Sequence, residues 1–133
     1  MLIATDAGYE PIVRAANELQ TTSLLLVLFG VEDSFPFKPR PSTILVSGMP
    51  AGIIACVPQL DEFGIASRLA STAGLPGCYD GTVVELAEIW LQSLEQSMRL
   101  QIEIVVSGSA ATVGAVVAMA GRLDVRALTL PSS

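Results

Sequence analysis

Short apolar runs alternate with longer amphipathic segments along the chain. Continuous runs of aliphatic residues are typical of strands buried on both faces, and apolar positions three or four residues apart are typical of helices. The runs predict strands at residues 2–5, 24–29, 44–46, 65–70, 102–106 and 125–130. The helical spacing predicts helices from residue 11, at residues 52–63, from residue 82 and at residues 110–123.

The segments between these elements carry turn and capping signals. Residues 30–42 hold three prolines and form a predicted loop, and residues 71–81 form a glycine-rich connection. Thr82 and Glu85 have the spacing of a capping box, in which each side chain satisfies a free backbone N–H at a helix start. Asp61 and Glu62 are expected at the exposed end of a helix.

The alternation itself predicts the fold class. Parallel strands need a crossover long enough to hold a helix, and alternating strands and helices therefore indicate parallel pairing. We expect a doubly wound, mostly parallel α/β sheet of five or six strands, Rossmann-like, with helices on both faces. A length of 133 residues predicts one domain over residues 1–133.

Composition adds a prediction about assembly. Hydrophobic residues make up 51% of the chain and charged residues only 15%, below the roughly 25% of an ordinary domain. A composition this rich in hydrophobic residues and this poor in charged ones excludes a disordered chain. The apolar surplus predicts a surface covered by a second subunit, and hence a homodimer.

Charge and residue types exclude several function classes. The net charge of −6 has the wrong sign for a nucleic-acid binder. The chain has no histidine, which removes Ser-His-Asp and Cys-His catalysis and imidazole metal sites. Cys56 and Cys78 form no Cys-x-x-Cys pair and fit a reducing cytoplasm. Residues 104–121 carry no charge, but Ser107, Gly108 and Ser109 near their start favour strand, turn and helix over a membrane span.

The carboxyl ends of the predicted strands supply the candidate site. Ligands of doubly wound sheets bind beyond these ends, and the following helix N-termini favour phosphate. Small or turn-forming residues follow several strands, although tight turns need glycine without any ligand. Glu32 follows the second strand, where an acid commonly accepts hydrogen bonds from an adenosine ribose and disfavours a 2′-phosphate; a solvated loop charge is the alternative. The candidate ligand-binding residues are Thr5, Asp6, Gly8, Glu32, Ser107, Gly108 and Ser109.

Three segments together resemble a known family. Residues 2–11, residues 81–86 and residues 104–109 are similar to the nicotinamide-binding domain of ferredoxin–NADP reductase-like flavoenzymes, with the electron-transfer subunit of dihydroorotate dehydrogenase as the nearest branch. The resemblance implies a reductase-like nucleotide-binding fold, NAD(H) as cofactor and a role in electron transfer. No flavin or iron–sulfur site is visible in the chain, so a separate flavoprotein partner is implied.

The chain also departs from that family's pattern. Ser107 stands where the family has a cysteine beside the nicotinamide, and Ser109 replaces a proline. Thr5 and Asp6 stand where glycines usually let the pyrophosphate approach. Two alternatives therefore stay open: a non-catalytic scaffold that self-associates, and a small enzyme using serine or cysteine without histidine.

Two further features have open roles in the sequence. Cys78 is either an accessible thiol or a packed one. Residues 35–41 are stiff and aromatic, and form either a docking strip or a lid folded on its own sheet.

Overall fold

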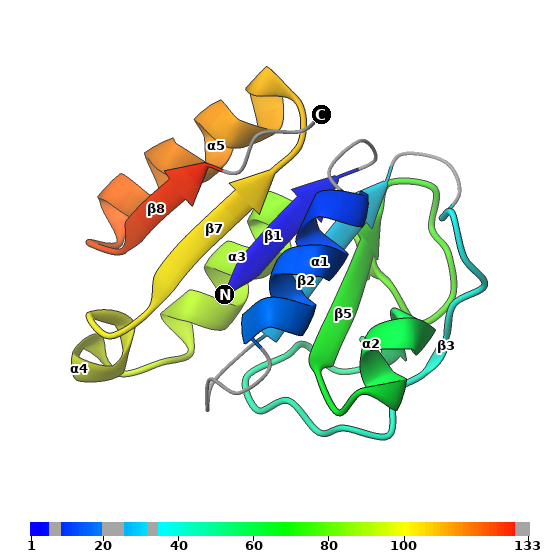
Figure 1. The fold of residues 1–133 in the computed structure, drawn as a ribbon. Coiled ribbons are helices and arrows are strands. Elements are labelled where there is room, and N and C mark those ends of the chain that lie inside the picture. The colour runs from blue at the N-terminus through cyan, green and yellow to red at the C-terminus, as the bar shows by residue number, and fades with distance from the viewer. Residues whose placement is uncertain (6–8, 20–25, 32–34, 130–133) are drawn as a thin grey trace.

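A six-stranded parallel sheet forms the centre of the computed structural model (Figure 1). The structure describes residues 1–5, 9–19, 26–31 and 35–129. The strand order is β6-β5-β2-β1-β7-β8, and every neighbouring pair runs parallel. The strands are β1 (Leu2–Thr5), β2 (Leu26–Val31), β5 (Ala66–Ser71), β6 (Tyr79–Asp80), β7 (Glu103–Ser107) and β8 (Arg126–Thr129). The predicted doubly wound α/β fold is confirmed.

Helices cover both faces of this sheet. Helix α1 (Tyr9–Leu19) packs on one face, and α3 (Val83–Gln92) and α5 (Ala110–Arg122) pack on the other (Figure 1). Successive strand residues point to opposite faces. In β1, accordingly, Leu2 contacts the core under α1 and Ile3 the core under α3 and α5. Burial on both faces explains why the strands appear in the sequence as continuous apolar runs.

The strand order reverses beside β1. From β1 the chain adds β2, β5 and β6 on one side, and then crosses back through α3 to place β7 on the other side of β1. In sheets of this kind such a reversal opens a crevice at the carboxyl ends of the two strands. The ends of β1 and β7 are therefore the expected ligand position.

Several predicted boundaries shift by a few residues. Strand β2 continues through Gly30 and Val31, which were expected in the loop, and residues 24–25 lie outside the described residues. The predicted connection at residues 71–81 contains the short strand β6, and a short helix α4 (Gln96–Arg99) follows α3. The capping box is confirmed, because Glu85 N donates to Thr82 Oγ1 and Thr82 N donates to Glu85 Oε1.

Two predictions between β2 and β5 are wrong. Residues 44–46 are not a strand: Leu45 is 97% exposed, and side chains rather than a neighbouring strand bond this stretch. Residues 52–63 are not one helix, because Gly52 has φ +87° and a two-stranded antiparallel sheet of β3 (Arg40–Pro41) and β4 (Ala55–Cys56) intervenes. Only α2 (Pro58–Glu62) is helical, with Pro58 in its first turn, where the missing N–H costs nothing.

Asp61 lies in a buried polar cluster, which corrects its expected exposure. Its side chain is 7% exposed and accepts from Ser42 Oγ (2.7 Å), Thr43 Oγ1 (2.9 Å) and Thr43 N (3.3 Å). Arg68 of β5 is also buried, and its guanidinium donates to the carbonyl oxygens of Ser67 and Ile44. These contacts hold residues 42–44 against β5 and α2.

The aromatic segment packs on its own sheet. Phe29, Phe35 and Phe37 form a cluster with ring centroids 5.3–5.9 Å apart. Phe29 is fully buried in β2, and Phe35 and Phe37 are partly buried against the same core. Of the two predicted roles, the structure favours the folded segment over an unpacked docking strip.

Candidate functional site

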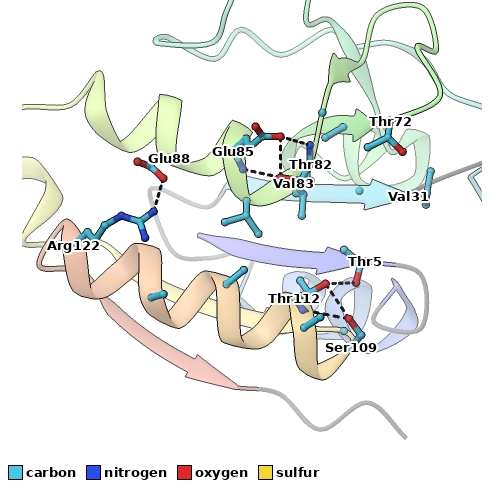
Figure 2. Close-up of a pocket in the computed structure, with 18 residues that line it drawn as sticks. Thr5, Val31, Thr72, Thr82, Val83, Glu85, Glu88, Ser109, Thr112 and Arg122 are labelled. Carbon is cyan, nitrogen blue, oxygen red and sulfur yellow. Dashed lines mark hydrogen bonds and ion pairs between the residues drawn. The ribbon is translucent and has the colours of Figure 1, made fainter.

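An open cavity of about 650 Å³ lies between α3 and α5 at the carboxyl side of the sheet (Figure 2). Its volume falls within the roughly 300–1,000 Å³ typical of small-molecule pockets. Sheet residues Thr5, Gly30 and Ala70 form its floor, from the ends of β1, β2 and β5. The cavity therefore reaches the predicted crevice, and it extends from there along both helices. The walls include Val83, Val84, Glu85 and Glu88 of α3 and Ala111, Thr112, Ala115, Ala118 and Arg122 of α5.

Three hydroxyl groups meet at the end of the cavity nearest β1 (Figure 2). Thr112 Oγ1 lies 3.3 Å from Thr5 Oγ1 and 3.1 Å from Ser109 Oγ. Ser109 caps α5, since its Oγ accepts from Thr112 N. Three hydroxyls carry three protons and the two contacts between them use two. One O–H thus remains to donate to a ligand oxygen.

The turn from β7 into α5 requires glycine. Gly108 has φ +156°, and a Cβ at this position would come within 2.4 Å of Thr5 Oγ1. A larger residue would push the start of α5 away from β1. Gly108 therefore sets the close approach that brings Ser109 and Thr112 to Thr5.

The opposite end of the cavity carries an ion pair. Arg122 Nη2 lies 2.8 Å from Glu88 Oε1, and Gln92 Nε2 donates to Glu88 Oε2 at 3.4 Å. Figure 2 shows Arg122 reaching from α5 across to α3. On α5 the cavity wall carries three alanines, Ala111 beside Thr112 at the hydroxyl end, and Ala115 and Ala118 between Thr112 and Arg122.

The structure brings together three of the seven residues predicted to bind a ligand. Thr5, Gly108 and Ser109 line the cavity. Ser107 does not: it follows Val106, which faces α3 and α5, so strand alternation turns Ser107 toward the α1 face. Its hydroxyl is fully buried and has no hydrogen-bond partner in the described part of the chain. Asp6, Gly8 and Glu32 lie outside the described residues.

The helix walls of the cavity were missed by sequence reasoning. Glu88 of α3 pairs with Arg122 of α5. The alanines at positions 111, 115 and 118 follow helical spacing, which predicts a packed helix face as readily as a cavity wall. The small size of these side chains was the only sequence signal for a cavity wall. It indicates a cavity only when α3 is known to lie opposite α5.

Both cysteines are free and buried, away from the cavity lining. Burial raises the pKa of the Cys78 thiol above its ordinary value. Burial, reinforced by the Asp61 carboxylate, also raises the pKa of Cys56. Since the thiolate is the reactive form, this favours the packed role for Cys78 over a redox role.

Comparisons with protein-family models, with curated proteins and with solved structures found no match. In the part of the chain that the structure describes, no helix is long and apolar enough to cross a membrane. Residues 104–121, which carry no charge, instead form most of β7, the Gly108 turn and most of α5.

Proposed function

We propose that this chain is a nicotinamide-nucleotide-binding module of the ferredoxin reductase type, with NAD(H) as its ligand. The observation that carries the proposal is the position of the cavity. One end of it, at Thr5 and Gly108, lies beside the ends of β1 and β7, where the strand order reverses, the place at which ligands bind in doubly wound sheets.

The residues present are compatible with such a ligand. Thr5, Ser109 and Thr112 offer one free O–H among them. Ala110 and Ala111 occupy the first two positions of α5, where backbone amides have no acceptor within the helix. These donors suit a phosphate or ribose oxygen. Glu85, the nearest acid at the start of α3, is occupied by its capping box, which limits its repulsion of an anion.

The proposed role is that of an electron-transfer accessory subunit. Bound NAD(H) supplies hydride chemistry, and the residues of this chain bind and orient it. The acceptor would reside on a separate flavoprotein, because hydride transfer needs a second redox group.

Calorimetric and thermal-shift titration with NADH, NAD⁺ and NADPH tests the proposal. Ligand at a hundred times its dissociation constant should raise stability by about 2.7 kcal/mol. Thr112→Val removes one hydroxyl of the cavity and should weaken binding about fivefold, the equivalent of one hydrogen bond of about 1 kcal/mol. Thr129→Val, at an exposed position on β8 outside the cavity, serves as the matched control. Absence of saturable binding with every nicotinamide form would overturn the proposal.

A second candidate function is a self-associating scaffold, in which the same fold forms a homodimer. The outward side of α5 favours it, since Ala110, Gly114, Val117 and Gly121 are exposed and uncharged. Val117 is 49% exposed. Light scattering at micromolar concentration should then report a dimer, and Val117→Glu should convert it to a monomer. A monomeric wild-type chain would exclude this candidate.

A further inference from the structure

The side walls of the cavity differ in character from its two polar ends. Apart from Glu85 and Thr112, they consist of Val83 and Val84 at the start of α3 and of the three alanines of α5. Ala111 and Ala118 are seven residues apart, which corresponds to about 10 Å of helix. The cavity between the two helices is thus a slot with mostly apolar walls, about as long as a nucleoside.

The slot ends at polar groups with unused capacity. A guanidinium has five N–H donors and a carboxylate about four acceptor sites. Arg122 uses one donor on Glu88, and Glu88 accepts from Arg122 and Gln92. An adjacent donor and acceptor therefore remain at this end, supplied by Arg122 and Glu88 respectively.

Apolar walls and a paired donor and acceptor select a particular kind of group. A charged or heavily hydroxylated group would lose water to the alanine and valine side chains without compensation. A flat, uncharged heteroaromatic ring would contact the walls with its faces. A ring edge that carries a donor beside an acceptor would match Glu88 and Arg122.

We propose that the slot between α3 and α5 binds the base of the nucleotide, ring edge toward the Glu88–Arg122 pair. Two groups share this chemistry: the carboxamide edge of nicotinamide, and the edge of adenine formed by its amino group and a ring nitrogen. This inference rests on the proposed function, and it adds the part of the ligand that enters the slot.

The decisive variant is Ala115→Leu, which fills the slot from the α5 wall. Ala115 is exposed and its replacement disturbs no core contact. Val117→Leu is the control: it places the same side chain on the same helix, at an exposed position outside the cavity lining. Binding of NADH, ADP-ribose and reduced nicotinamide mononucleotide is measured for wild type and both variants.

The set of ligands whose affinity falls identifies which ring, nicotinamide or adenine, occupies the slot. If nicotinamide enters the slot, Ala115→Leu weakens NADH and the mononucleotide at least tenfold and leaves ADP-ribose unchanged. If adenine enters it, NADH and ADP-ribose weaken and the mononucleotide does not. Arg122→Leu should lower affinity for the same ligands about fivefold, and loss of this exposed ion pair leaves the fold intact.

Two other outcomes are separable. Saturable NADH binding that Ala115→Leu leaves within twofold of wild type would overturn the slot assignment while the proposed function stands. No binding of any of the three ligands to the wild-type chain would remove the proposed function, and the slot assignment with it.

Discussion

Replacing Asp61 by Asn should destabilise the fold far more than its position at the end of a short helix suggests. The carboxylate accepts hydrogen bonds from Ser42 Oγ, Thr43 Oγ1 and Thr43 N. It also lies close enough to the buried Arg68 to stabilise that guanidinium's charge. Asn keeps the shape of the side chain and one acceptor oxygen, but removes the charge.

The expected loss is about 2 kcal/mol. A net hydrogen bond to a charged group contributes about 1.5–3 kcal/mol and a neutral one about 1 kcal/mol. In Asp61→Asn, three hydrogen bonds to a carboxylate would be replaced by one or two hydrogen bonds to a neutral amide. The neutral side chain is also cheaper to bury than the carboxylate, which offsets part of that difference.

Urea denaturation at two pH values measures this effect. Burial alone would raise the pKa of Asp61, but the hydrogen bonds from Ser42 and Thr43, with a smaller effect of Arg40, lower it below its ordinary value of 3.8. A carboxyl whose pKa is lower in the folded than in the unfolded state stabilises above the unfolded value, and this contribution is lost as the pH falls through the folded one. The gap between wild type and Asp61→Asn should therefore be full at pH 7 and shrink below about pH 4.

Glu62 provides the matched control, because its side chain is largely exposed and pairs with Arg40 at 3.5 Å. Glu62→Gln should cost less than about 1 kcal/mol. Equal stabilities for Asp61→Asn and wild type at pH 7 would refute the reasoning, as would a gap that does not change with pH.

Four further predictions concern two glycines, a helix cap and the thiols. Gly108→Ala should destabilise by about 2 kcal/mol or more, through its φ and the contact with Thr5. Gly114→Ala should instead stabilise by about 0.5–1 kcal/mol, because a helical Cβ there meets no atom within 4 Å; thermal unfolding measures both. Thr82→Ala should cost about 1 kcal/mol and Thr82→Ser much less, since serine keeps the capping oxygen. Because their pKa values are raised by burial, Cys56 and Cys78 should react with a thiol reagent at pH 7 far more slowly in the folded chain than in urea. Rapid labelling of the native chain would contradict this last prediction.

The sheet and its helices could be predicted because local signals agreed with the tertiary structure. The runs around Ile3, Leu28 and Ile104 are apolar since both faces of those strands are buried. The Thr82–Glu85 capping box depends on four consecutive residues, and for that reason needs no knowledge of the rest of the chain. The secondary-structure prediction was correct where the hydrophobic pattern had one cause, the burial of one or both faces of the element.

The segment between β2 and β5 could not be predicted, because contacts distant in sequence determine it. Ile44 looks like a strand residue, yet its carbonyl oxygen accepts from Arg68, 24 residues away. Asp61 was expected at the surface, but Ser42 and Thr43 fold over it. Gly52 could have warned against a helix through residue 52.

The candidate site was half predictable for a similar reason. Thr5, Gly108 and Ser109 lie at strand ends, and the sheet rule places such residues at the crevice. Ala115, Glu88 and Arg122 become site residues only through the pairing of α3 with α5. The residue spacing within α3 or within α5 does not predict that these two helices lie side by side.

The two edges of the sheet differ in how much strand they offer to another molecule. On one side, β6 pairs with β5 only at Ala70 and Ser71. Farther down β5, Val57 N donates to Ser67 Oγ and the Arg68 guanidinium donates to Ser67 O. On the other side, β8 pairs along its length with β7 and with no further strand of the described chain. An uncovered edge invites a strand from another molecule. Strand β8 is the longer of the two end strands, with four residues against two in β6, and two copies joined by a two-fold axis through β8 would cover each other's longer edge.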